Sequence, residues 1–271
     1  TADDNEGTGV DPGSWAMNSS FTPTSVQTSQ ETLITNEVSD YVQNKAEHKF
    51  TVRYDVDVPE LNVSVKTAEG ETTSPVLTKD DVTITAKAKD NYELEKVELH
   101  YTAGDGTPEA VQELESTETD ETGFNTYTFT VTTDIYVKRT YWVEAYDKAG
   151  NLAKSDEYVI EIDKEAPKLE EVTLSPSVES GNWTNQDTTF TIIVTNDNES
   201  SAVPSKILYK KGDSGTWVAV GDGKLKDGKP GETPQWEFTF KETDNIFDGT
   251  YFFRAEDSLG NITDESFAYK Q

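Results

Sequence analysis

The chain of 271 residues contains no cysteine and only two histidines, His48 and His100. Without cysteine, neither a disulfide framework nor a thiolate metal site is available. The two histidines are far apart in sequence, and neither is part of a zinc-hydrolase motif such as H-E-x-x-H. A phosphate-binding loop, a dinucleotide fingerprint and a G-x-S-x-G nucleophile elbow are also absent. The sequence therefore predicts a protein that is not an enzyme.

Positive charge is scarce as well, because 52 acidic residues outnumber 23 basic residues and give a net charge of −29. Nucleic acid and anionic membrane surfaces are themselves polyanions, so we expect neither as a partner. No apolar run approaches the roughly 20 residues that a membrane-spanning helix needs. The high threonine content and the shortage of helical periodicity favour an extracellular all-β protein.

One heptapeptide occurs twice. AYDKAGN (145–151) returns as AEDSLGN (255–261), and each copy follows an aromatic strand, YWVEA (141–145) or YFFRA (251–255). Successive side chains of a strand point to opposite faces, so each strand has one inward and one outward set. The inward set is predicted to be Tyr141, Val143 and Ala145 in the first copy, and Tyr251, Phe253 and Ala255 in the second.

A longer stretch is repeated in the same order. LTKDDVTITAKAKDN (77–91) matches WTNQDTTFTIIVTND (183–197), and Pro59 and Pro167 are 108 residues apart. That period is the size of one immunoglobulin-like sandwich and too long for a propeller blade. The repeat predicts two corresponding buried rows, which are Val82, Ile84, Ala86 and Ala88, and Thr188, Phe190, Ile192 and Val194.

The motifs WTNQD, DGTY, A-x-D-x-x-G-N and D-x-x-A-P together resemble bacterial immunoglobulin-like domains, which occur in tandem on surface proteins, adhesins and accessory regions of secreted enzymes. The resemblance covers residues 57–271, although the first copy has Leu77 in place of the tryptophan and VKRTY (137–141) in place of DGTY. It implies an all-β fold of two tandem immunoglobulin-like antiparallel β-sandwiches. We expect them at 57–164 and 165–271, after an extended N-terminal segment, 1–56, that contains β-strands.

In this fold the linker that enters each sandwich and two of its loops lie at the same end, so their acidic residues are expected to meet. Calcium takes six to eight oxygen ligands and suits such a cluster. By the resemblance, calcium would stiffen the rod at both junctions. The alternative is that these residues only hydrogen-bond the backbone of their own turns. The candidate ligands are Asp55, Asp57, Asp90, Asp147 and Asn151 at the first junction, and Asp163, Glu165, Asp197, Asp257 and Asn261 at the second.

The N-terminal segment is too short for a third sandwich. HKFTVRYD (48–55) reads like EYVIEID (157–163), the closing strand of the first repeat, while SWAMNSSF (14–21) and ETLITNEV (31–38) are the further candidate strands. A closing strand that lacks the other strands of its sandwich needs a partner to pair with. Two hypotheses follow: the segment is the remnant of an upstream repeat, or it lends a strand to a neighbouring subunit and so builds a homopolymer.

Two functions remain open. The first is a structural or adhesive rod of a cell-surface protein or filament, with other protein subunits or cell-surface and matrix ligands as partners. The second is a carbohydrate-binding or spacer region of a secreted polysaccharide-degrading enzyme. In that case the outward aromatic residues Trp142, Tyr146 and Trp217 would stack on sugar rings. The family resemblance also leaves room for an internal isopeptide bond from a first-strand lysine such as Lys66 beside a buried acid.

Overall fold

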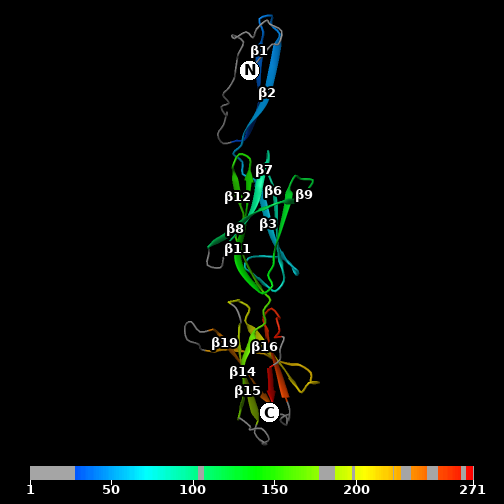
Figure 1. Ribbon diagram of the computed structural model, residues 1–271, viewed down its shortest axis with the longest axis vertical. Coiled ribbons are helices and arrows are strands. Elements are labelled where there is room, and N and C mark those ends of the chain that lie inside the picture. Colours follow the sequence, from blue (N-terminus) through cyan, green and yellow to red (C-terminus); the bar gives the residue numbers. More distant parts are fainter. Residues whose placement is uncertain are drawn as a thin grey trace.

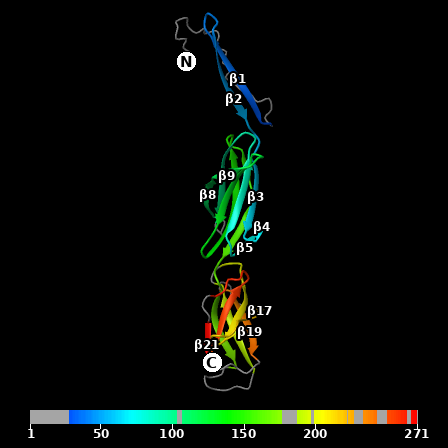
Figure 2. The same cartoon turned by 90° about the vertical axis from the view of Figure 1, so that its right-hand side faces the viewer.

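The computed structural model describes residues 28–102, 107–176, 187–196, 199–221, 223–226, 233–242, 250–263 and 267–270. Every regular element in these ranges is a β-strand. A two-stranded hairpin, a first sandwich and a second sandwich follow one another along the long axis of the molecule (Figure 1), and a view from the side gives the same order (Figure 2). Among the described residues, no helix has the length and apolarity to cross a membrane.

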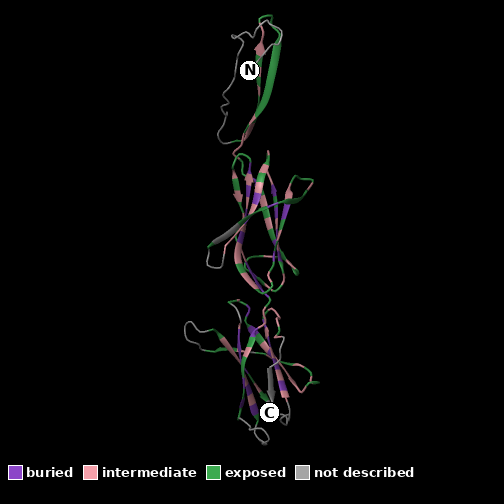
Figure 3. Ribbon diagram, viewed as in Figure 1, coloured by how far each residue is buried: buried purple, intermediate pink, exposed green. Residues whose placement is uncertain are grey.

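The hairpin pairs β1 (Gln30–Ser39) antiparallel with β2 (Lys45–Tyr54). The predicted strands at 31–38 and 48–55 are thus partners of each other, so the expected closing strand is paired within its own segment. Within the described part of the chain, these two strands pair with no other strand. Most of their side chains are exposed (Figure 3).

The first sandwich consists of two sheets. In spatial order, one sheet contains β4 (Gly70–Thr72), β3 (Glu60–Thr67), β6 (Val82–Lys89), β10 (Asn125–Val131) and β9 (Ser116–Thr119). The other contains β5 (Val76–Thr78), β13 (Tyr158–Asp163), β11 (Tyr136–Asp147), β7 (Leu94–Thr102) and β8 (Pro108–Leu114), and β12 (Leu152–Lys154) also pairs with β11. All pairs are antiparallel except the short pair of β5 with β13. This order matches the ABED and CFG sheets of immunoglobulin domains.

The second sandwich repeats the same order. One sheet contains β14 (Lys168–Ser175), β15 (Thr188–Thr195), β19 (Gln235–Glu242) and β18 (Lys224–Lys226). The other contains β17 (Val218–Gly221), β16 (Pro204–Lys211), β20 (Thr250–Asp257) and β21 (Phe267–Lys270). The predicted fold class, two tandem immunoglobulin-like antiparallel sandwiches after a segment with strands, is confirmed. The predicted boundaries at 56/57 and 164/165 fall in the linkers before β3 and β14.

Each sandwich has its own core, and both cores include the predicted inward rows. Tyr141, Val143 and Ala145 are buried in the first, as are Tyr251, Phe253 and Ala255 in the second. The two repeated rows on β6 and β15 are buried along their whole length. Figure 3 shows this burial as purple bands along the inner strands. Trp236 and Phe240 are half-buried and pack against the second core, with Phe238 fully buried between them.

Some of the predicted features fall on residues that the structure does not describe. These are the strand at 14–21, the WTNQD motif up to Gln186, Asp197, and the Asp248–Gly249 part of DGTY, all of which lie outside them. Lys66, by contrast, is described and exposed on β3. An isopeptide bond needs a lysine beside a buried acid, so Lys66 does not fit that role.

Candidate functional site

The turn after β11 encloses a buried carboxylate. Asp147 is fully buried, and its Oδ1 accepts a hydrogen bond from the main-chain N–H of Asn151 at 2.8 Å. Its Oδ2 accepts one from the Asn151 side-chain amide at 2.7 Å. Gly150 has a φ of 90°, a left-handed conformation that glycine adopts without steric cost. The A-x-D-x-x-G-N motif therefore builds a closed turn around its own aspartate.

The linker before the first sandwich is tied to two of its loops. The Asn151 side-chain amide also donates to the main-chain oxygen of Asp55 at 3.3 Å. From the loop after β6, the Asn91 amide donates to Asp55 Oδ1 at 3.2 Å and to Asp57 Oδ2 at 3.4 Å. Ser29 Oγ donates to Asp55 Oδ1 at 2.6 Å. Asp55 is thus fixed by the hairpin and by two loops of the sandwich, while Asp57 lies exposed at the rim.

Three carboxylates converge at this junction. Asp55, Asp90 and Asp147 each offer one oxygen atom, and the three atoms lie within 4.8 Å of one another. Asp90 Oδ1 accepts main-chain hydrogen bonds from Tyr92 and Glu93, but its Oδ2 is buried and has no hydrogen-bond partner. Like charges at this separation repel, and a buried unpaired oxygen is costly, so a bound cation would relieve both. An all-oxygen donor set is the one calcium prefers.

The second junction has the same turn. Asp257 is buried, and its Oδ1 accepts hydrogen bonds from the N–H groups of Leu259 and Asn261 at 2.8 and 2.9 Å. The Asn261 amide donates to Asp257 Oδ2 at 2.9 Å and to the main-chain oxygen of Asp163 at 3.0 Å. Glu165 N–H donates to the Asp163 carboxylate at 3.0 Å. Turn and linker are therefore joined as they are at the first junction.

The acidic cluster, however, does not recur among the described residues. The repeat alignment places Asn196 where the first sandwich has Asp90. The Asn196 side-chain amide donates to the main-chain oxygens of Ser200 and Ala202. A neutral group thus replaces one of the three carboxylates. Hydrogen bonds bring predicted residues together at both junctions, but among the described residues three carboxylates meet only at the first. Asp197 lies outside the described residues.

Direct contacts between the two sandwiches hold the second junction. Glu161 on β13 is buried and accepts hydrogen bonds from Ser201 N–H at 2.6 Å and Ser201 Oγ at 2.9 Å. Lys138 Nζ lies 2.9 Å from the same carboxylate. Burial alone would raise the pKa of Glu161, but the hydrogen bonds from Ser201 and Lys138 outweigh it and hold the pKa below its usual value. Lys79 Nζ also donates to Gly260 O at 3.4 Å.

The predicted stacking residues already contact other side chains. The Trp142 ring stacks on His100, which lies on β7, and has Lys154 Nζ from β12 at 4.5 Å from its centroid. Because β7 and β12 lie on opposite sides of β11, the Trp142 ring is flanked from both sides. Lys96 lies over the ring of Tyr146. Lys210 and Arg254 lie over that of Trp217. Sugar stacking on these three residues stays a prediction.

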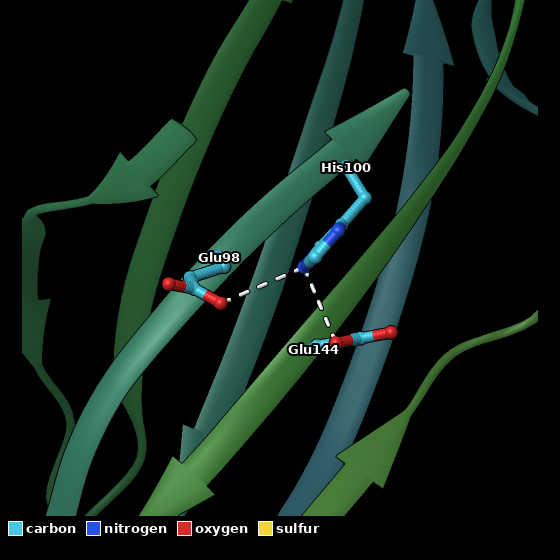
Figure 4. A group of neighbouring side chains, drawn as sticks. All are labelled: Glu98, His100 and Glu144. Carbon is cyan, nitrogen blue, oxygen red and sulfur yellow. Dashed lines mark ion pairs between the residues drawn. The ribbon is translucent and has the colours of Figure 1, made fainter. Parts of the chain in front are cut away.

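Sequence reasoning missed one cluster, Glu98, His100 and Glu144 on the outer face of the first sandwich (Figure 4). The alternation E-x-H on one strand and W-x-E on another was visible in the sequence. That these two patterns lie side by side depends on the strand register, which pairs Glu144 with Glu98 and Trp142 with His100.

No protein-family model matches the chain, and no curated protein matches its sequence. Many solved structures are similar to it, and three of them serve as examples. Rst D1-D2 has 10% sequence identity and a TM-score of 0.37, over 76% of this chain and 96% of that one. A marsupial T cell receptor has 10% identity and a TM-score of 0.28, over 78% and 99%. The fibronectin(III)-like modules of Clostridium thermocellum CbhA have 15% identity and a TM-score of 0.27, over 75% and 90%.

Proposed function

We propose that this chain is a non-enzymatic structural or adhesive rod of an extracellular protein. The observation that carries the proposal is that, at both junctions, a hydrogen bond fixes the segment that enters the sandwich. Asn151 joins a turn of the first sandwich to the main-chain oxygen of Asp55 in the linker after β2. Asn261 joins the corresponding turn of the second sandwich to the main-chain oxygen of Asp163, the last residue of β13. Domains in one chain move relative to each other unless their interface is fixed. Linkers that are tied to the following sandwich favour a stiff, extended molecule.

The two junctions are held by different chemistry. At the second, the buried Glu161 carboxylate accepts both hydrogen bonds of Ser201 across the interface. At the first, three carboxylates meet, and one buried oxygen of Asp90 has no protein donor. We therefore place a calcium ion at the first junction, with Asp55, Asp90 and Asp147 as ligands. In this proposal calcium stiffens the joint between the hairpin and the first sandwich.

Thermal melting with and without calcium tests the metal. Extracellular calcium modules have dissociation constants of about 0.1–1 mM, so calcium at about 1 mM should stabilise the protein by about 0.4–1.4 kcal/mol. Asp90→Asn, which copies the residue at position 196, should abolish the effect. Asp156→Asn, at an exposed position of the same sandwich, removes the same charge and should retain it. An unchanged melting temperature in wild type would rule out the calcium site.

The hairpin supports assembly by strand exchange. Its turn repeats the hydrogen bonds of the Asp147 turn: Asn44 N–H donates to Asp40 Oδ1 at 2.8 Å, and the Asn44 amide donates to Asp40 Oδ2 at 2.7 Å. The hairpin thus corresponds to the last two strands of a sandwich, and an isolated two-stranded hairpin is marginally stable in water. We propose that the segment lends a strand to a second copy of the chain and is covered by that copy in return.

Electron microscopy of the purified protein in negative stain tests assembly. Ordered filaments, lost when residues 1–56 are deleted, are expected. A monodisperse monomer whose residues 1–47 resist proteolysis would show that the segment needs no neighbour, and it would leave the rod itself intact as a proposal.

A further inference from the structure

The outer face of the first sandwich carries a compact group of metal-binding side chains. Glu98 and His100 are two residues apart on β7 and therefore point to the same side, away from the core residues Val97 and Leu99. Glu144 on β11 lies directly opposite Glu98. Figure 4 shows the imidazole directed between the two carboxylates. The three side chains are 14%, 16% and 13% exposed, respectively.

The imidazole nitrogen is close to both acids without being hydrogen-bonded to either. His100 Nε2 lies 3.2 Å from Glu144 Oε2 and 3.6 Å from Glu98 Oε2. The same atom is buried and has no hydrogen-bond partner among the described residues. A neutral imidazole with its proton on Nδ1 would direct the Nε2 lone pair at two negative charges. A shared cation satisfies all three groups at once.

The spacing fits a small divalent transition metal. In a tetrahedral zinc site with bonds of about 2.0–2.2 Å, two ligand atoms are about 3.3–3.6 Å apart. The two measured separations from His100 Nε2 are close to that range. Calcium ligands are oxygen atoms, whereas an imidazole nitrogen together with carboxylates suits zinc. The group is thus chemically distinct from the all-carboxylate cluster at the junction.

Neighbouring side chains hold the carboxylates in place. Trp142 Nε1 donates to Glu144 Oε1 at 2.9 Å, and Tyr146 OH donates to Glu144 Oε2 at 2.7 Å. Lys96 Nζ donates to Glu98 Oε1 at 2.6 Å, which leaves Oε2 as the oxygen nearer the histidine. Groups of this kind orient metal ligands and are part of functional metal sites.

We propose that Glu98, His100 and Glu144 form a binding site for a divalent transition-metal ion, for which Zn²⁺ has the most suitable ligand chemistry. Three protein ligands leave one tetrahedral position for water or for a group from another molecule. The site does not depend on the rod, on calcium or on strand exchange. It is a property of two adjacent strands of one sheet.

Calorimetric titration of the full chain with zinc chloride tests the proposal. A single saturable site is expected in wild type. Loss of a group that only orients a metal ligand weakens metal binding by roughly 10–100-fold. His100→Ala removes a ligand itself and should weaken zinc binding by at least as much. His48→Ala is the matched control, because His48 is the chain's other histidine and is exposed on β2. This variant should bind zinc as wild type does.

Two further variants make the outcome decisive. Glu144→Gln keeps the shape of the side chain and should also lose zinc affinity. Circular dichroism without metal shows whether His100→Ala and Glu144→Gln are folded. Asp90→Asn should leave zinc binding unchanged. The proposal is overturned if wild type does not bind zinc. It is equally overturned if folded His100→Ala and Glu144→Gln bind as tightly as wild type, or if Asp90→Asn alone abolishes binding.

Discussion

The side-chain amide of Asn261 donates a hydrogen bond to the main-chain oxygen of Asp163, 98 residues earlier in the chain, at 3.0 Å. The same amide holds the buried carboxylate of Asp257. One side chain thus closes its own turn and attaches that turn to the end of β13 in the preceding sandwich. Asn151 and Asp55 have the corresponding relationship at the first junction. The repeated heptapeptide is therefore both a turn and a connection between modules.

Replacing Asn261 by alanine should destabilise the second sandwich. The change removes one donor from the Asp257 carboxylate, which is only 2% exposed, and a buried acceptor left unpaired costs about 1–3 kcal/mol. Hydrogen exchange of the β15 amides reports this loss as faster exchange. Asn44→Ala removes the same bond from an exposed turn and should change stability by less than about 0.5 kcal/mol. Equal effects of both variants would contradict the role of burial.

Gln43 occupies the turn position that corresponds to Gly150 and has a φ of 71°. A left-handed conformation costs a non-glycine residue roughly 1–2 kcal/mol. Glycine avoids this cost, but its greater freedom in the unfolded chain offsets part of the gain in stability. Gln43→Gly should therefore stabilise the hairpin by up to about 1 kcal/mol. Slower amide exchange in β1 and β2 is the expected result. The neighbouring change Val42→Gly lacks this benefit and should speed exchange; slower exchange there too would contradict the explanation.

The second junction should weaken in acid because of Glu161. Its pKa is lower in the folded protein than in the unfolded chain, so protonation favours unfolding. The stabilisation is fully present above the unfolded value of about 4.3 and is lost as the pH falls through the lower folded value. Melting temperatures of wild type and Glu161→Gln should therefore differ at neutral pH and converge in acid. The exposed Glu171→Gln should match wild type throughout. A gap that is constant down to pH 2 would contradict this assignment.

The fold was readable from the sequence because alternation and repetition report the core directly. Tyr141 and Tyr251 were placed inward by the period of two, and both are buried. The repeat alignment also matches Asn196 with Asp90. This difference in charge distinguishes the two junctions once the hydrogen bonds of Asn196 are known. The N-terminal hairpin was only partly predicted, because its two strands were recognised but their pairing was not.

The sites were less predictable because they depend on register between distant strands. His100 and Glu144 are 44 residues apart, and nothing local in the sequence indicates that they face each other. Trp142 was expected to present a ring for stacking. That side chains from β7 and β12 flank this ring could not be predicted. Alternation gives the face of a side chain, whereas the partners on that face follow from strand pairing.

Small-angle X-ray scattering of the chain in solution tests the rod most directly. A compact globule of this length would have a radius of gyration of about 18 Å. Two sandwiches and a hairpin in line predict a clearly larger radius and a pair-distance distribution with a long tail. A radius near that of the globule, with a symmetric distribution, would show that the modules fold back on one another and would contradict the account.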